Sequence, residues 1–326
     1  MKALVLGGAG FIGLHLVRAL AAEGNDVMIV DDFSRGRDDR ELAELGVPVV
    51  HADLTDPTSY QRLPRPWDQI FMLAAVVGVR NVEADPARVV RINTLSLLHL
   101  LDWMRPGERL FFASTSEVYA GGVSAGVVPV PTPESVPLMI GDISAPRFAY
   151  GASKLLGESA VVHTARSKQI PFVVGRFHNV YGARMGADHV IPELSLRALR
   201  KEDPFKLYGA DQSRAFCHVD DAVTATVRLM ASEDAAGQIV HVGNDTREIA
   251  IGDLAKLILR VAGHEPRMEW LPAPLGSVAR RCPDLSTLRR LTGFEPVVSL
   301  EDGIRRTFDW YRDSGRTESR GSRWTC

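Results

Sequence analysis

The sequence predicts an α/β protein with a doubly wound parallel sheet, and three observations carry that prediction. Short apolar runs alternate with segments of helical spacing along the first half of the chain. A glycine-rich turn joins the first apolar run to a helix, and later runs end in polar residues. Because the carboxyl ends of parallel strands meet at one edge of such a sheet, we expect these residues to gather there around a ligand.

The composition of the 326-residue chain excludes several classes of function. Hydrophobic residues make up 45% and charged residues 24%, which is typical of a soluble globular protein. The 38 Lys and Arg nearly balance the 40 Asp and Glu, so neither nucleic acid nor an anionic membrane is an expected partner. The three cysteines have no paired spacing, so we expect no disulfide framework, no metal site and a reducing cytoplasmic location.

The first predicted unit consists of a strand over residues 1–6, a glycine turn and a helix. The turn reads GGAGFIG, with Gly7, Gly10 and Gly13 in a GxxGxxG pattern. Such glycines permit a tight turn, let the backbone approach a pyrophosphate and bring the helix close to the strand. The helix N-terminus adds unpaired N–H groups and a partial positive charge, so we expect a dinucleotide there.

A second predicted strand, residues 27–30, ends at Asp31 and Asp32. Asp31 lies 18 residues beyond Gly13 (31 minus 13), close to where a carboxylate binds the ribose hydroxyls of adenosine. A carboxylate there repels the 2′-phosphate of NADP. NAD is therefore the expected cofactor, although Arg35 lies close enough to weaken that preference.

Three further strands are predicted over residues 47–52, 70–75 and 109–114. They are mainly apolar, as expected in a sheet that is covered on both faces. The first is followed by Asp53, and the last ends at Ser114, just before Thr115. These units complete the prediction of a Rossmann-type sheet with its ligand at the carboxyl ends of the strands.

Tyr150 and Lys154 stand four residues apart in a predicted helix and therefore share one of its faces. A tyrosine phenol has an ordinary pKa of about 10, but a nearby ammonium group and a positively charged nicotinamide ring favour the phenolate. The phenolate then takes a proton from a substrate hydroxyl while hydride leaves the same carbon for the cofactor. We expect Thr115 to hydrogen-bond the same oxygen.

Taken together, these motifs resemble the extended short-chain dehydrogenase/reductases, and specifically the NAD-dependent nucleotide-sugar epimerase/dehydratase family. The resemblance extends from Met1 to about Arg312. It rests on GGAGFIG at 7–13, DDFSRG at 31–36, LAA at 73–75, ASTSEVY at 113–119, YGASK at 150–154, GRFHNVYG at 175–182, SRAFCHVDDAV at 213–223, RCPDLS at 281–286 and GFEPVVSLEDGI at 293–304.

This resemblance implies a catalytic triad of Thr115, Tyr150 and Lys154 and a nucleotide-diphosphate sugar as substrate. It also implies that Arg214 and Arg281 hold the diphosphate, for which planar and permanently charged donors are well suited. The residues implied in NAD binding are Gly7, Gly10, Phe11, Ile12, Asp31, Asp32, Asp53, Leu54, Leu73, Ala74, Ala75, Asn93, Tyr150 and Lys154. Those implied in substrate binding are Arg80, Thr115, Ser116, Tyr150, Asn179, Val190, Ile191, Tyr208, Arg214 and Arg281.

The reactions of this family begin alike, with hydride transfer to NAD and a transient keto sugar, and differ in the next step. C4 epimerisation needs only the triad and room for the keto sugar to turn over, and the GVR stretch at 78–80 resembles the epimerases. Loss of carbon dioxide from a UDP-glucuronate-type sugar, or 4,6-dehydration, needs a further group, which Glu117 is placed to supply.

Other residues favour different members of this set of reactions. The TSE triplet at 115–117 and the Pro-Arg pair at 146–147 resemble the lyases. However, Ser116 replaces the aspartate of TDP-glucose dehydratases, and residues 75–80 lack the Ser-Pro segment of the decarboxylases. We therefore expect a C4 epimerase, with a decarboxylase or dehydratase as the alternative. A non-catalytic dinucleotide sensor on the same fold is a remote alternative.

Two domains are expected from this resemblance. The NAD-binding domain would comprise residues 1–175 and about 215–242, and a smaller C-terminal nucleotide-sugar domain would comprise 176–214 and 243–312. The polar tail, 313–326, is expected to be disordered. The family commonly forms homodimers through a four-helix bundle, and the apolar stretches 89–104 and 155–165 fit such a bundle.

Overall fold

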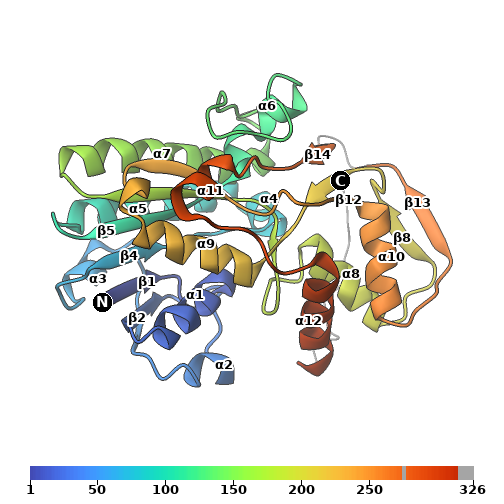
Figure 1. Ribbon diagram of the computed structural model, residues 1–326, viewed down its shortest axis with the longest axis horizontal. Helices are drawn as coiled ribbons and strands as arrows, with labels where there is room; N and C mark the ends of the chain where they lie inside the picture. The colour runs from blue at the N-terminus through green and yellow to red at the C-terminus, as the bar shows by residue number, and fades with distance from the viewer. Residues whose placement is uncertain (274–276, 315–326) are drawn as a thin grey trace.

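The computed structural model describes residues 1–273 and 277–314. Nearly all of the tail that was expected to be disordered, 313–326, therefore lies outside the described residues. The described chain consists of a large sheet covered by helices and a smaller group of helices and short strands beside it (Figure 1).

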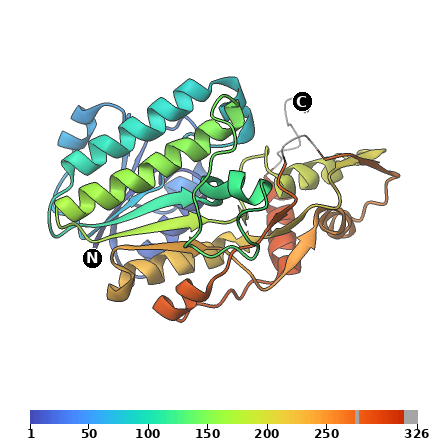
Figure 2. The ribbon, with the colours of Figure 1, turned by 90° about the horizontal axis from the view of Figure 1, so that it is seen from above.

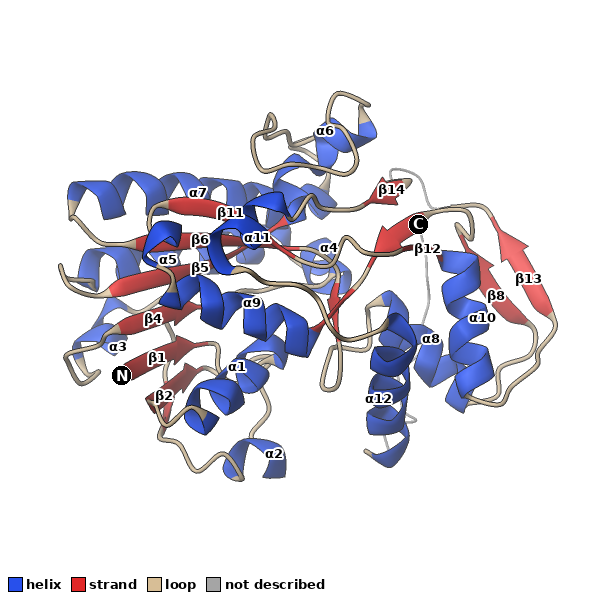
Figure 3. Cartoon of the chain, in the orientation of Figure 1, coloured by secondary structure: helices blue, strands red, loops and turns tan. Residues whose placement is uncertain are grey.

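A seven-stranded sheet forms the centre of the larger part, and all neighbouring strands in it are parallel (Figure 3). Its order is β11-β6-β5-β4-β1-β2-β3, so the chain begins in the middle and winds outward in both directions. This arrangement confirms the predicted doubly wound fold. The strands are β1 (Lys2–Leu6), β2 (Asp26–Asp31), β3 (Val49–His51), β4 (Gln69–Met72), β5 (Arg109–Thr115), β6 (Phe172–Phe177) and β11 (Gln238–Val242).

Helices cover both faces of this sheet (Figure 2). Val5 of β1 packs into the apolar cluster beneath one helical layer, and its neighbour Leu4 packs into the cluster beneath the other. Because both faces are buried, the strands are continuous apolar runs rather than alternating ones. One layer contains α3 (Pro57–Gln61), α5 (Pro86–Trp103) and α7 (Ala149–Ser167), and the other contains α1 (Phe11–Ala22), α9 (Val219–Ala231) and α11 (Ser286–Thr292).

The smaller part lies beyond the carboxyl ends of the central strands (Figure 3). Its helices α8 (Val190–Leu199), α10 (Ile251–Val261) and α12 (Leu300–Asp313) pack around an apolar cluster that includes Phe205 and Phe308. Its strands form three small sheets: β7 (Val180–Tyr181) with β10 (Cys217–His218), β9 (Ser213–Ala215) between β12 (Glu248–Ala250) and β14 (Arg280–Arg281), and β8 (Phe205–Tyr208) with β13 (Met268–Leu271). The remaining short elements are α2 (Arg40–Ala43), α4 (Val79–Ala84), α6 (Ala120–Ser124) and the 3-10 helices Ser116–Tyr119, Pro146–Phe148 and Glu233–Ala235.

Two predicted strands are shorter in the structure. The strand expected over 47–52 covers only Val49–His51, at the edge of the sheet. The strand expected over 70–75 ends at Met72, because the N–H groups of Leu73 and Ala74 both donate to the Leu6 carbonyl, at 2.9 and 2.8 Å. This double hydrogen bond turns residues 73–75 out of the sheet and against the glycine turn.

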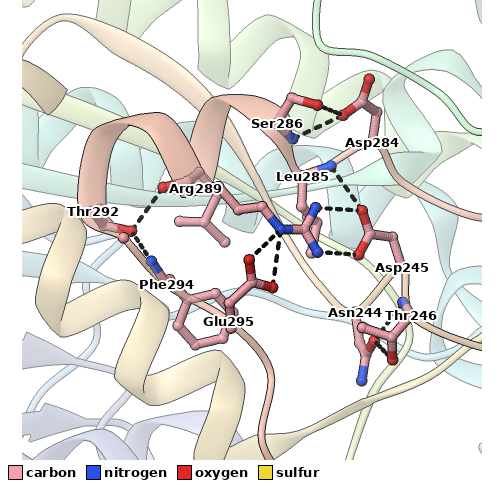
Figure 4. Close-up of polar contacts among 12 residues, drawn as sticks. Asn244, Asp245, Thr246, Asp284, Leu285, Ser286, Arg289, Thr292, Phe294 and Glu295 are labelled. Carbon is pink, nitrogen blue, oxygen red and sulfur yellow. Dashed lines mark hydrogen bonds and ion pairs between the residues drawn. The ribbon is translucent and has the colours of Figure 1, made fainter.

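An ion-pair cluster fixes the segment between β14 and α11 to the large sheet (Figure 4). The guanidinium of Arg289 donates to the two carboxylate oxygens of Asp245 at 2.8 and 2.7 Å, and to Glu295 at 2.8 Å. The hydrogen bonds that Arg289 donates to Asp245 and Glu295 raise its pKa, and it remains charged. Because Asp245 closely follows β11 and Arg289 lies in α11, the cluster anchors α11 beside the large sheet.

Candidate active site

The glycine turn between β1 and α1 forms a backbone cradle at the carboxyl edge of the sheet. Gly7 has a φ of +85°, and a Cβ there would lie 2.6 Å from the backbone nitrogen of Ala74, so the position requires glycine. Gly10 caps α1 without a side-chain hydrogen bond, and no acidic residue lies in the first turn. The first N–H groups of α1 are therefore available to an anion, and this arrangement fits the pyrophosphate of a dinucleotide.

The acidic residues predicted at the strand ends lie at the same edge. Asp31 is buried at the end of β2, and its carboxylate accepts hydrogen bonds from the N–H groups of Ala9 and Phe33 at 3.0 and 2.9 Å. Burial outweighs these bonds and raises the pKa of Asp31. Asp53 follows β3 and accepts hydrogen bonds from both the N–H and the hydroxyl of Thr55 at 2.8 Å. Asp32, which follows Asp31, is exposed, and Leu54, which follows Asp53, is buried.

Asn93 lies on α5 and holds the loop that follows β4 through hydrogen bonds. Its amide oxygen accepts a hydrogen bond from the Val76 N–H at 2.7 Å, and its amide nitrogen donates to the Val76 carbonyl at 3.2 Å and to the Ser153 hydroxyl at 3.1 Å. Asn93 thus connects α5, the loop that follows Ala74 and Ala75, and the helix that carries Tyr150.

Thr115, Tyr150 and Lys154 come together where β5 meets α7. The side chains of Tyr150 and Thr115 are hydrogen-bonded, and the Lys154 ammonium lies 6.0 Å from the centre of the Tyr150 ring. Lys154 donates to the carbonyl of Ala113 at 2.7 Å. Burial raises the pKa of Tyr150 and lowers the pKa of Lys154 to about 7. The structure therefore brings these three predicted residues together.

Glu117 forms an ion pair with Arg281 next to the triad. Arg214 lies beside Arg281 in the paired strands β9 and β14, so the structure brings together the two arginines predicted for the diphosphate. Burial and the charge of Arg281 lower the pKa of Arg214 to about 10. Burial raises the pKa of Glu117, but Arg281, with Arg147 and Arg214, outweighs burial and holds that pKa below its usual value.

A buried cluster of Tyr119, His178 and His241 lies behind this pair. The Tyr119 hydroxyl lies 2.5 Å from Nε2 of His178 and 3.2 Å from Nε2 of His241. Burial lowers the pKa of both histidines, to about 3 for His241, so they are neutral at physiological pH. His178 lines a cavity, shared with Ser116 and Arg281, that has room for about one water molecule. This cluster was not predicted from the sequence, although His178 directly precedes the predicted Asn179.

The other predicted substrate residues lie on several separate elements. Asn179 donates to the carbonyl of Ala215 at 2.9 Å. Val190 and Ile191 open α8, whose first turn has no side-chain cap. Tyr208 ends β8 with 42% of its surface exposed, and Arg80 forms an ion pair with Asp188 at 3.0 Å. The structure shows no contact of Arg80 or Tyr208 with the triad.

Within residues 1–273 and 277–314, no group of His, Cys, Asp or Glu side chains is arranged to hold a metal ion. None of the helices in this part of the chain is both long and apolar enough to cross a membrane.

The sequence profile of the NAD dependent epimerase/dehydratase family matches residues 3–243 of the chain, well over half of its length. The chain belongs to this family. Its enzymes use NAD, and the glycine cradle and Asp31 at the sheet edge fit that cofactor.

The enzyme is similar over almost its whole length to proteins named as decarboxylases. It is 31% identical to UDP-N-acetyl-alpha-D-glucosaminuronate decarboxylase of Bacillus cytotoxicus, over 96% of this chain and 98% of that protein. It is also 31% identical to UDP-glucuronic acid decarboxylase 1 of Xenopus tropicalis, over 95% of this chain and 72% of that protein.

Solved structures with the same fold include epimerases. UDP-glucose 4-epimerase of Thermotoga maritima, solved with UDP-glucose, has a TM-score of 0.85 and 29% identity over 97% of this chain and 100% of that one. UDP-glucose 4-epimerase of Thermus thermophilus, solved with NAD, has a TM-score of 0.82 and 29% identity over 96% of this chain and 99% of that one. The chain therefore shares its fold with structures that hold NAD or a nucleotide sugar.

Proposed function

We propose that the enzyme removes carbon dioxide from a UDP-hexuronic acid, the alternative in the sequence analysis rather than the C4 epimerisation favoured there. The observation that carries this proposal is the Glu117–Arg281 ion pair beside the triad. Epimerisation at C4 requires no such pair. A carboxylated sugar, by contrast, needs a cation for its carboxylate and, after carbon dioxide has left, a proton for the remaining carbon. The similarity to two decarboxylases supports the same choice.

The first step is oxidation of the sugar at C4. When bound, NAD supplies the hydride acceptor and donor, and its positive ring favours a phenolate nearby. Tyr150 takes the proton of the C4 hydroxyl, and Thr115 holds the phenol in place by its hydrogen bond. Because burial raises the pKa of Tyr150, the charge of Lys154 is needed for this step.

NAD would lie along the carboxyl edge of the sheet. Its pyrophosphate would bind the N–H groups of the turn, and its adenosine ribose would bind Asp31. The residues that we propose to line it are Gly7, Gly10, Phe11, Ile12, Asp31, Asp32, Asp53, Leu54, Leu73, Ala74, Ala75, Tyr150 and Lys154. We propose that Asn93 acts through the Val76 loop.

Loss of carbon dioxide follows from the position of the new carbonyl. The C4 carbonyl is β to the carboxylate on C5, so the C5–C6 bond breaks and its electron pair passes to the carbonyl oxygen. Tyr150 and Thr115 donate hydrogen bonds to this oxygen and stabilise the enolate. Arg281 binds the substrate carboxylate, which takes the place of Glu117.

This exchange of partners controls the proton on Glu117. In the free protein, Arg281 keeps the pKa of Glu117 low in spite of burial. When the substrate carboxylate takes Arg281, burial dominates, the pKa rises and Glu117 takes up a proton. Glu117 then donates that proton to C5 of the enolate, and its carboxylate pairs with Arg281 again. Hydride would then return to C4 from the bound cofactor while Tyr150 gives its proton back to the C4 oxygen. In total, a hexuronate and one proton become a pentose and carbon dioxide.

The nucleotide would lie in the smaller part of the molecule. We propose that Arg214 and Asn179 bind the diphosphate, together with the free N–H groups at the start of α8, where Val190 and Ile191 lie. Ser116 would face the sugar next to Thr115. Tyr208, exposed at the end of β8, would lie by the base.

C4 epimerisation of a hexuronate is a second candidate, favoured by one observation. Residues 76–80 read VVGVR without the Ser-Pro segment of the decarboxylases, and Arg80 reaches across to Asp188 at 3.0 Å. Arg80 would then hold the carboxylate away from Glu117, and the sugar would turn over without losing it.

We also propose two features of the whole molecule. The NAD domain comprises residues 1–175 and 215–242, and the sugar domain comprises 176–214 and 243–312. The chain forms a homodimer through the outer faces of α5 and α7, where Val90, Leu98 and Leu156 are exposed at 40%, 40% and 49%. Such exposed apolar side chains on adjacent helices favour a four-helix interface between two copies.

Incubation with UDP-glucuronic acid and with UDP-N-acetylglucosaminuronic acid tests the proposed reaction. Mass spectrometry of the nucleotide sugar should show loss of carbon dioxide from at least one of them. An isomer of unchanged mass would instead support the epimerase, and the absence of any product from both would overturn the proposal.

A further inference from the structure

The loop of residues 32–39, which joins β2 to α2, packs directly on the cofactor cradle. The N–H of Arg37 donates to the Ala9 carbonyl at 3.2 Å. A Cβ at Gly36 would lie 2.8 Å from Cβ of Ala9 and 2.6 Å from a carboxylate oxygen of Asp31. The 32–39 loop thus packs against the two features that we propose for NAD binding: the glycine turn and the carboxylate of Asp31.

Arg184 fastens this loop from the other part of the molecule. It lies three residues beyond β7, and its guanidinium donates to the two carboxylate oxygens of Asp39 at 2.8 and 2.7 Å. It also donates to the carbonyls of Arg37 at 3.0 Å and of Ala9 at 3.4 Å. Only 1% of its side chain is exposed. One buried cation therefore joins the 32–39 loop, the glycine turn and the segment after β7.

A second set of contacts holds both partners of this ion pair to α12. The Trp310 indole donates to Glu41 of α2 at 2.8 Å, just after the 32–39 loop. The Tyr311 hydroxyl donates to the carbonyl of Met185, next to Arg184. Arg35, within the 32–39 loop, adds a further contact, because its guanidinium donates to the carbonyl of Val77 in the loop after β4.

We propose that Arg184 is a positioning residue for the cofactor: it holds the 32–39 loop closed over the adenosine half of NAD and slows the departure of NAD from the enzyme. The chemistry of the reaction gives a reason for slow dissociation of NAD. In a reaction without net oxidation, the hydride taken from the sugar must return to the same sugar, so a cofactor that leaves during the cycle ends it. The proposal rests on the family's use of NAD and holds whether the product is a pentose or an epimer.

The dissociation rate of NAD tests this proposal without any sugar. Enzyme loaded with isotope-labelled NAD is mixed with excess unlabelled NAD, and the label that remains bound is followed over time. Arg184→Gln and Asp39→Asn should each increase the dissociation rate about tenfold or more, as expected from the loss of a charge-assisted hydrogen bond. Arg197→Gln is the matched control, because Arg197 is also buried, is paired with Glu202 at 2.9 and 2.8 Å and lies in α8.

The control should change the rate by less than about twofold, within the range of remote substitutions. An unchanged rate in folded Arg184→Gln and Asp39→Asn would overturn the proposal, as would an equal increase in Arg197→Gln. If Arg184→Gln does not fold, Asp39→Asn decides alone, because Asp39 is one-third exposed and its substitution leaves no buried cavity.

Discussion

The Arg281 guanidinium donates a hydrogen bond to the carboxylate of Glu117, although 164 residues separate the two in the chain. Glu117 lies in a 3-10 turn after β5 of the large sheet, and Arg281 lies on β14 in the smaller part. The pair therefore spans the boundary between the two parts, next to Thr115 and Tyr150. The proposed reaction requires that this ion pair opens, so that Arg281 can bind the carboxylate of the substrate.

Glu117→Gln should separate decarboxylation from the protonation of C5. The amide cannot donate a proton to C5, so formation of the UDP-pentose should fall about a hundredfold or more, while the absorbance of the reduced cofactor still appears on mixing with UDP-glucuronic acid. Glu248→Gln is the control, because Glu248 pairs with Arg280, the direct neighbour of Arg281. UDP-pentose formation at the wild-type rate in Glu117→Gln would refute the role of this carboxylate.

The pKa of Lys154 predicts a pH dependence of stability. This pKa is about 7 in the folded protein and 10.5 in its unperturbed state, so between these values the unfolded chain binds a proton that the folded protein does not. The free energy of unfolding should therefore rise with pH over this range. Relative to Lys154→Met, NAD-free wild type should gain about 2 kcal/mol between pH 7 and pH 9 in urea unfolding. A difference between the two proteins that is the same at both pH values would contradict the lowered pKa of Lys154 in the NAD-free protein.

Gly7→Ala should disturb the cradle more than an ordinary glycine substitution. Gly7 and Gly24 both have positive φ, but only at Gly7 would a Cβ meet the backbone of Ala74. Gly24→Ala should cost about 1–2 kcal/mol from backbone strain alone, and Gly7→Ala about 1–3 kcal/mol more. Chemical denaturation measures both, and Gly7→Ala should also weaken NAD binding in calorimetry. Equal losses of stability and unchanged NAD affinity would argue against the close contact.

The homodimer can be tested by light scattering. Wild type should have twice the chain mass of 35.7 kDa. Leu156→Arg places a charge on the proposed interface and should give a monomer. Ile143→Arg is the control, since Ile143 is 92% exposed but precedes α7 and lies outside both interface helices. A monomeric wild type would show that the faces of α5 and α7 have another role.

Much of the fold could be predicted because it depends on local pattern. The run from residue 2 to 6, the turn at Gly7 and the spacing of Tyr150 and Lys154 are each short segments whose geometry follows from their own residues. The strand after Gln69 was predicted too long, because its end is set by hydrogen bonds from Leu73 and Ala74 to a distant carbonyl of β1. An apolar run contains no pattern that would indicate such a distant hydrogen-bond partner.

The parts of the site that were not predicted depend on tertiary contacts. Arg281 was assigned to the diphosphate from its type and its motif, and only the fold places it against Glu117. Arg184 has its role through Asp39, which lies 145 residues away in the chain. His178 and His241 likewise meet only because β6 and β11 are neighbours in the sheet. Residue type indicated possible chemistry in each case, while the packing decides which groups act together.

The most direct test of the central claim is the reaction of UDP-glucuronic acid in heavy water, with product analysis by mass spectrometry and NMR. Our account predicts release of carbon dioxide and a UDP-pentose with one deuterium at C5, where the proton from Glu117 arrives. An isomeric UDP-hexuronic acid that retains its carboxylate and carries no deuterium would contradict it. That result would show that Arg281 and Glu117 hold the sugar while its C4 centre is inverted.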